Sequence, residues 1–244
     1  MIDIMKGKIM SERTINIWKD PYGEGFDTCK SEQVTLHSGL TVLVGCNGAG
    51  KSTLLKNIKS ELDKYKIPYH SFDNLNDGGS RARENAAFEE DFAFLATSAS
   101  SSEGENITMN IGTLLSKLKK FMRTGRVESR TTKLIDALSG EEYKVPEAKE
   151  RWLLLDAIDS GYSIDNVVAV KRVLKLVIND FKLNGYDLFI VASANEYELA
   201  NGEDCFDVNA GEYVKFKDYK DFKKFILKSR EIKDTRYKSK IMER

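Results

Sequence analysis

The chain has 244 residues, 41% of them hydrophobic and 31% charged, with 38 Lys and Arg balanced by 38 Asp and Glu. This composition excludes a largely disordered chain, and the length suffices for one sizeable hydrophobic core. No apolar run approaches the roughly 18 residues of a membrane span, and the N-terminus lacks a basic segment followed by an apolar one. We therefore expect a cytoplasmic protein without membrane insertion. Three scattered cysteines predict neither a disulfide framework nor a zinc site.

The N-terminal part, residues 1–44, is expected to be rich in β-structure. Thr14–Trp18 and Val34–His37 alternate apolar and polar residues, which is typical of half-buried strands. Leu40–Val44 is a nearly continuous apolar run, which predicts a strand buried on both faces of a mainly parallel sheet. Apolar residues at helical spacing then predict a helix from Ser52 to about Lys66.

The middle of the chain, residues 84–150, is expected to form a helical subdomain with an insertion. One helix is predicted from Ile107 to about Arg123. Residues 124–150 are rich in Ser, Thr and charge, so they fit either a small inserted element or a mobile excursion.

The C-terminal half continues the alternation of strands and helices. Buried strands are predicted at Arg151–Asp156 and Leu188–Ala192, with a helix from Val167 to Asn184 between them. A hairpin from Phe206 to Phe216 and a basic helix within residues 215–244 follow. The whole pattern predicts one α/β domain over residues 1–244, with a mainly parallel core sheet flanked by helices and an antiparallel N-terminal part.

The strongest motif is the segment Gly45–Thr53, which matches the strand–GxxxxGK[ST]–helix pattern of a P-loop NTPase in its required context. Glycines let successive backbone N–H groups turn inward, Lys51 reaches the β- and γ-phosphates, and Ser52 can hold Mg²⁺. The sequence therefore predicts a site for ATP and Mg²⁺. We expect the nucleotide to contact Asn47, Gly48, Ala49, Gly50, Lys51, Ser52 and Thr53.

A second part of such a site is a carboxylate at the end of another buried strand. Asp156 follows the apolar run Trp152–Leu155 and is predicted to position the metal. The alternative is an aspartate that ends a strand and caps a turn.

With these motifs the chain resembles the ABC-type ATPase superfamily. Ser101–Glu105, directly before the helix expected at Ile107, is similar to the signature motif LSGGE, with Ser102, Gly104 and Glu105 at matching positions. In that family the signature of one subunit closes on the γ-phosphate held by the other, which implies an ATP-dependent head-to-tail homodimer. Leu138–Glu142 is closer letter by letter, but Pro146 interrupts the helix that should follow, so we favour Ser102.

The run from Asp156 to Asp165 resembles that of SMC, Rad50 and RecF heads, and the chain is also similar to compact ABC-type ATPases of bacteriophages. Ala157 stands where the family has the glutamate that polarises water, which implies slow hydrolysis. Asp159 is the obvious replacement base, although a turn cap is an equal alternative. Asn195 stands where the family has a histidine that senses the γ-phosphate.

Two features of the site are less specific in the sequence. Tyr22 or Trp18 is a candidate for stacking on adenine, and the alternative for each is a place in the core. The glutamine that links the phosphate site to a partner in this family has no counterpart here, and the stretch from Phe72 to Ser80 occupies its place.

Two biological roles stay open from the sequence. The first is a nucleotide switch in DNA metabolism (repair, recombination or replication), and the second is an ATP-sensing regulatory or motor subunit that docks a protein, such as a defence effector or a membrane subunit. Residues 215–244 hold 12 basic and 5 acidic residues, a net charge of +7, so the other 214 residues carry −7. This segment and a second basic cluster are candidate surfaces for DNA or an acidic partner. The second cluster comprises Lys117, Lys119, Lys120, Arg123, Arg126, Arg130 and Lys133.

Overall fold

The computed structural model describes residues 10–19, 29–73, 118–126, 130–140, 143–160 and 162–242. Its centre is a six-stranded sheet in the order β4-β5-β6-β3-β7-β8. β7 and β8 pair antiparallel, whereas every other neighbouring pair in this sheet runs parallel. The strands are β3 (Gly39–Val44), β4 (Tyr69–Asp73), β5 (Glu150–Asp156), β6 (Asp187–Ser193), β7 (Asp204–Asp207) and β8 (Glu212–Val214).

A second, two-stranded sheet comes from the N-terminal part, where β1 (Glu12–Asn16) pairs antiparallel with β2 (Gln33–His37). Together the two sheets confirm the expected fold class, an α/β fold with a mainly parallel core sheet and an antiparallel N-terminal part. Among the described helices, none is both long and apolar enough to cross a bilayer.

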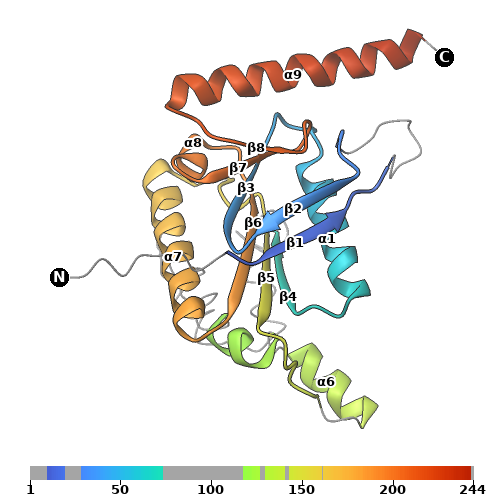
Figure 1. Cartoon of the computed structure of the whole chain (residues 1–244), viewed down its shortest axis with the longest axis vertical. Helices are drawn as coiled ribbons and strands as arrows, with labels where there is room; N and C mark the ends of the chain where they lie inside the picture. The colour runs from blue at the N-terminus through green and yellow to red at the C-terminus, as the bar shows by residue number, and fades with distance from the viewer. Residues whose placement is uncertain are drawn as a thin grey trace, which may run out of the picture.

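Helices cover both faces of the main sheet (Figure 1). α1 (Lys51–Lys64) lies on one face together with β1 and β2, and α7 (Ile164–Leu183) lies on the other. Because successive strand residues point to opposite faces, Leu153 and Leu155 of β5 pack toward α7, whereas Trp152 and Leu154 pack toward α1. This double burial explains why the core strands read as continuous apolar runs.

The long C-terminal helix α9 (Tyr219–Met242) crosses one edge of the main sheet, past β7 and β8 (Figure 1). Its first half is held by apolar contacts. Phe222 is buried, and Phe225 and Ile226 pack against the same core as α7. The ring of Phe216 meets that of Phe222 edge-on, with centroids 5.1 Å apart. α9 is therefore fixed to the domain.

Two further helices are α8 (Tyr197–Ala200) and α6 (Arg130–Ser139). α6 lies within residues 124–150, which the sequence allowed to be either a small inserted element or a mobile excursion. The presence of this helix favours the inserted element. Of the helix expected from Ile107 to Arg123, residues 118–124 are helical. Residues 107–117 lie outside the described part of the chain.

Candidate functional site

The loop that joins β3 to α1 has the backbone of an anion-binding site. Gly45, Gly48 and Gly50 all have positive φ, of 149°, 78° and 103°. Residues with a side chain avoid this region, so the loop's path requires glycine. Gly50 is the N-cap of α1 and gives no side-chain cap. The first N–H groups of α1 are therefore available to a phosphate at the positive end of the helix dipole.

Lys51 folds back on its own loop. Its side chain is 8% exposed, and its Nζ donates to the carbonyl oxygen of Gly45 at 2.8 Å and to that of Cys46 at 3.3 Å. Burial lowers the pKa of Lys51, and the charges of Cys46, Asp159 and Asp156 oppose that shift. A buried ammonium held by neutral carbonyls, on a flexible stem, can turn to a phosphate that brings negative charge.

Asp156 ends β5 at the same edge of the sheet, with β6 between β5 and β3. Its Oδ1 accepts a hydrogen bond of 2.6 Å from the hydroxyl of Ser193, the last residue of β6. Because the carboxyl ends of parallel strands share one edge, the Lys51 loop and Asp156 lie at the same edge of the sheet. Ser193 was not predicted, although a hydroxyl that ends a buried apolar strand is a signal that the sequence carries.

Asp159 lies beside this group and is 2% exposed. Its Oδ2 accepts the backbone N–H of Asn195 at 2.6 Å and of Glu196 at 2.7 Å, and its Oδ1 has no hydrogen-bond partner among the described residues. Burial raises the pKa of Asp159, and these backbone N–H groups oppose that shift. The sequence allowed Asp159 to be either a replacement base or the cap of a turn. In the structure its carboxylate caps the backbone N–H groups of the segment that leads into α8.

Asn195, expected to sense the γ-phosphate, follows β6 by two residues. Its side chain is exposed, and its Nδ2 lies 3.4 Å from the hydroxyl of Ser160. The amide therefore stands at the carboxyl edge of the sheet, in the loop that Asp159 caps.

The C-terminal helix α9 also contacts the phosphate loop. This contact was not predicted from the sequence. On α9, the Ser229 hydroxyl accepts the backbone N–H of Cys46 at 3.0 Å, and Lys233 Nζ donates to the carbonyl oxygen of Asn47 at 2.9 Å. These partners are 183 and 186 residues apart in the sequence. No local pattern signals such a contact.

The residues present fit a magnesium ion bound together with a phosphate. Ser52 is exposed in the first turn of α1, and Asp156 supplies one carboxylate. Mg²⁺ is usually held by one or two such oxygens plus substrate phosphates and water. Among the described residues, no group of three or more His, Cys, Asp or Glu side chains could hold a metal ion.

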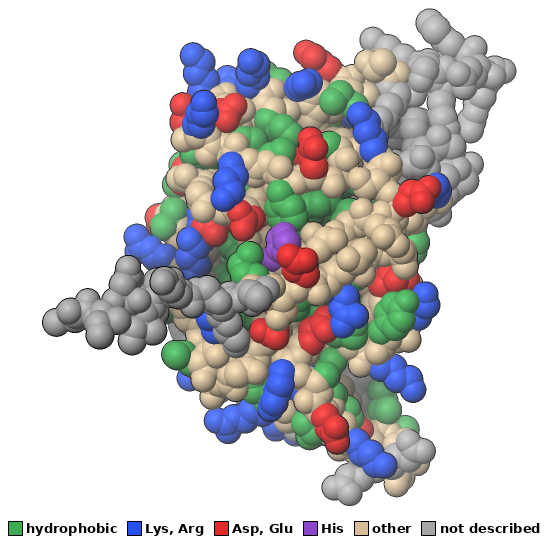
Figure 2. All heavy atoms as spheres, viewed as in Figure 1, with side chains coloured by type: hydrophobic (Ala, Val, Ile, Leu, Met, Phe, Trp, Pro, Cys, Tyr) green, Lys and Arg blue, Asp and Glu red, His purple; other side chains and the backbone are tan. Residues whose placement is uncertain are grey.

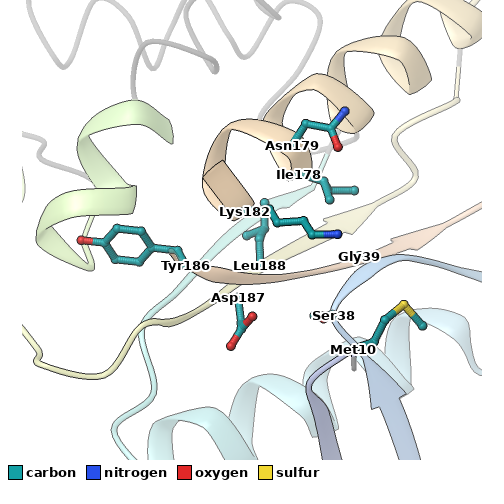
Figure 3. Close-up of a pocket in the computed structure, with 9 residues that line it drawn as sticks. All are labelled: Met10, Ser38, Gly39, Ile178, Asn179, Lys182, Tyr186, Asp187 and Leu188. Carbon is teal, nitrogen blue, oxygen red and sulfur yellow. The ribbon is translucent and has the colours of Figure 1, made fainter. Parts of the chain in front are cut away.

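A separate cavity of about 180 Å³ opens at the opposite edge of the sheet (Figure 3). It lies where β3 and β6 begin, whereas the phosphate loop follows the end of β3. Its volume is below the roughly 300–1,000 Å³ of ordinary ligand pockets, so we assign it no ligand. The lining residues include Met10, Ser38, Gly39, Lys182, Tyr186 and Asp187.

Some predicted site residues lie outside the described part of the chain, namely Tyr22, Ser102, Gly104 and Glu105. The signature motif and the adenine contact of Tyr22 therefore stay predictions. Trp18, the other adenine candidate, is partly buried, and its backbone N–H donates to the Asn57 side chain at 2.7 Å.

The competing signature candidate, Leu138–Glu142, begins at the end of a helix. Leu138 and Ser139 are the last residues of α6, and the described residues 143–149 are not helical. In the described residues 143–149 there is thus no helix after this candidate, as Pro146 led us to expect, and the choice of Ser102 stays a prediction.

No protein-family model and no curated protein matches the sequence. Two of the solved structures that are similar to the chain are ATP-binding cassettes or parts of ABC transporters. One is the ADP conformation of MJ1267, an ATP-binding cassette of an ABC transporter, with 13% identity over 91% of this chain and 98% of that chain, at a TM-score of 0.47. The other is cbiO1 from Clostridium perfringens, part of the ABC transporter complex cbiONQ, with 15% identity over 82% of this chain and 86% of that chain, at a TM-score of 0.44.

Proposed function

We propose that the chain is an ABC-type ATPase that binds ATP and Mg²⁺ at the carboxyl edge of its main sheet. The observation that carries the proposal is the convergence of two sequence motifs at this edge. The buried Lys51 of the glycine loop is close enough to Asp156 and Asp159 for both carboxylates to act on its pKa. Asp156 is also fixed by the Ser193 hydroxyl.

Each residue has a distinct role in this proposal. The N–H groups of the loop and of the first turn of α1 hold the phosphates, and Lys51 moves from the loop carbonyls to the β- and γ-phosphates. Ser52 and Asp156 would hold Mg²⁺, which when bound neutralises phosphate charge. Ala157 cannot accept a proton, so we propose slow hydrolysis, with Asp159 as the base and Asn195 near the γ-phosphate.

Nucleotide binding is tested by titrating a fluorescent ATP analogue into the wild-type chain and into Lys51→Ala. Lys56→Ala is the matched control, because Lys56 lies on the same helix and is exposed. We expect the Lys51 variant to bind at least tenfold more weakly and the control to bind like wild type. Equal binding by all three proteins, or no binding by any, would refute the proposal.

We further propose that the site is completed by a second copy of the chain, as the resemblance implies. The Ser102 and Gly104 region of one subunit would face the phosphates held by Lys51 of the other, with ATP stabilising the closed dimer. Size-exclusion chromatography with light scattering tests this scheme. A dimer should form with ATP and Mg²⁺, whereas a monomer under every condition would refute it.

For the biological role we propose a nucleotide switch in DNA metabolism. Figure 2 shows Lys and Arg side chains, mixed with acidic ones, along the edge of the molecule that α9 forms. The exposed residues there include Lys220, Lys223 and Lys224. In the second basic cluster, Lys119, Lys120 and Arg123 are exposed, but Arg126 is engaged by both carboxylate oxygens of Asp136 at 2.9 and 2.6 Å.

Double-stranded DNA should stimulate ATP turnover at moderate salt, and added salt should remove the effect, because phosphate contacts are strongly salt-dependent. Failure to bind DNA at any salt would favour the alternative, an ATP-sensing subunit with weak hydrolysis that docks a protein. The observation that favours this alternative is Ala157, which supplies no base. Pull-down with ATP, compared between wild type and Lys51→Ala, tests whether a partner binds only the loaded state.

A further inference from the structure

From Phe222 to Lys233, one face of α9 is turned to the domain, and this face reaches the phosphate loop. Phe222, Ile226, Ser229 and Lys233 follow at intervals of three or four residues, which places them on one side of a helix. The first two pack into the core, and the next two hydrogen-bond to the phosphate loop. This geometry makes the stretch of α9 from Ser229 to Lys233 part of the wall of the site.

Ser229 fixes the position of α9 at the base of the loop. It is 3% exposed, and its hydroxyl accepts both the Cys46 N–H at 3.0 Å and the Asn209 side-chain N–H at 2.9 Å. Asn209 lies in the turn between β7 and β8. The hairpin, the loop and α9 thus meet at one buried hydroxyl, one helical turn before Lys233.

Lys233 and Lys51 donate hydrogen bonds to neighbouring carbonyl groups of the loop. Lys51 holds the oxygens of Gly45 and Cys46, and Lys233 holds that of Asn47 at 2.9 Å. Lys233 Nζ also lies 2.8 Å from the place where a Cβ on Gly48 would be. Two ammonium groups therefore flank the loop, one from α1 and one from α9.

The two lysines are in chemically similar positions. Lys51 donates to two carbonyl oxygens and Lys233 to one, all of a loop that presents glycines and a helix N-terminus to an anion. A bond from an ammonium to a phosphate oxygen is roughly twice as strong as one between neutral groups. Lysine has three donors on a flexible stem, so Lys233 can exchange the Asn47 oxygen for a phosphate without movement of the fixed helix.

The position of Lys233 along the loop indicates which phosphate it meets. The backbone N–H groups of such a loop cradle the α- and β-phosphates, and the loop lysine reaches the β- and γ-phosphates. Lys233 bonds the carbonyl oxygen of Asn47, directly next to the Cys46 carbonyl that Lys51 holds, so both ammonium groups start from the same part of the loop. We propose that Lys233 is a second phosphate-binding lysine, supplied by α9 of the same chain, which contacts the terminal phosphate of bound ATP. This inference rests on the proposed ATP binding.

The test compares ATP with ADP on the full-length chain. Fluorescent analogues of both nucleotides are titrated, with Mg²⁺, into wild type, Lys233→Met, Lys233→Arg and the control Lys228→Met. Lys228 is on the same helix and is exposed. We expect Lys233→Met to weaken ATP binding about tenfold and ADP binding less than threefold. Lys233→Arg should recover part of the loss, and Lys228→Met should match wild type.

Thermal melting without nucleotide separates this role from a structural one. If Lys233 only fastens α9 to the loop, Lys233→Met will lower the melting temperature and weaken ATP and ADP binding equally, which overturns the inference. Affinities indistinguishable from those of Lys228→Met overturn it as well. If wild type binds neither nucleotide, the proposed function fails with it. If wild type binds ATP through Lys51 while Lys233→Met is unchanged, the inference alone fails.

Discussion

Ser193 links two strand ends through one hydroxyl, which donates to Asp156 Oδ1 at 2.6 Å and accepts the Ala157 N–H at 2.8 Å. The side chain is 2% exposed, so water does not readily replace it. A single buried serine therefore orients the Asp156 carboxylate, which we propose holds Mg²⁺, and also accepts the hydrogen bond of the next backbone N–H, that of Ala157.

Replacement of this serine should affect both stability and the metal. Ser193→Ala leaves the buried Ala157 N–H unpaired, which should cost about 1–3 kcal/mol of unfolding free energy. Loss of a group that orients a metal ligand typically weakens metal affinity roughly 10-fold or more. Urea unfolding and a Mg²⁺ titration of ATP binding measure the two effects. Ser71→Ala, at an exposed strand position, is the control, and an unchanged Mg²⁺ dependence would contradict the assigned role.

Gly211 in the turn between β7 and β8 should not tolerate a side chain. Its φ is +78°, and an added Cβ would lie 2.5 Å from both Cys29 Sγ and Ser31 Oγ. Gly202 has φ +72° but no atom within 4 Å of that position. Gly202→Ala should cost about 1 kcal/mol from backbone strain alone. Gly211→Ala should cost about 1–3 kcal/mol more, because the clash adds to the strain. Equal losses of unfolding free energy for Gly202→Ala and Gly211→Ala in chemical denaturation would show that the turn shifts to make room for the added Cβ.

Much of the fold could be predicted because its core strands are buried on both faces. Leu40–Val44 is a nearly continuous apolar run and Leu188–Ala192 an unbroken one, and the structure places them in β3 and β6. β4 carries a weaker signal, since Tyr69–Asp73 holds a histidine, a serine and an aspartate and is only partly buried at the edge of the sheet. Partial burial leaves little pattern in the sequence.

The site divides in the same way. Lys51 and Asp156 were predicted because phosphate binding needs a fixed local motif and a carboxylate at a strand end. Ser229 and Lys233 were not, since they act on the loop only through the docking of α9, which depends on contacts made by Phe222 and its neighbours. Tertiary contacts of this kind have no local signature.

Asp159 should give the wild type a distinctive dependence of stability on pH. Burial raises its pKa above the ordinary value, so the native state binds more protons than the unfolded state between the unfolded and folded pKa values. The wild type therefore loses stability as the pH rises through that window. Asp159→Asn lacks this titration, and its amide oxygen can still accept the Asn195 and Glu196 N–H groups.

The difference in unfolding free energy, wild type minus Asp159→Asn, should thus be largest below the window and fall as the pH rises. Urea unfolding without nucleotide or Mg²⁺, from acid to neutral pH, measures it. Glu147→Gln, at an exposed position, controls for the loss of one carboxylate. Parallel curves for wild type and Asp159→Asn would show that burial does not shift this carboxyl group.

Ala157 should limit the chemical step, because it stands beside Asp156 without a group that accepts a proton. The φ of Ala157 is 50°, and its backbone N–H donates to the Ser193 hydroxyl. This hydrogen bond holds the backbone in the same place when the side chain at position 157 is changed. Since a positioned general base contributes roughly 10²–10⁴-fold, Ala157→Glu should raise single-turnover phosphate release by roughly 100-fold. Ala157→Gln has nearly the same shape but no base, and should stay at the wild-type rate. Equal rates for the Glu and Gln variants would mean that a carboxylate at position 157 does not act as a base. Because Asp159 is the base proposed for the wild type, Asp159→Asn in the wild-type background should reduce turnover whichever result the two variants give.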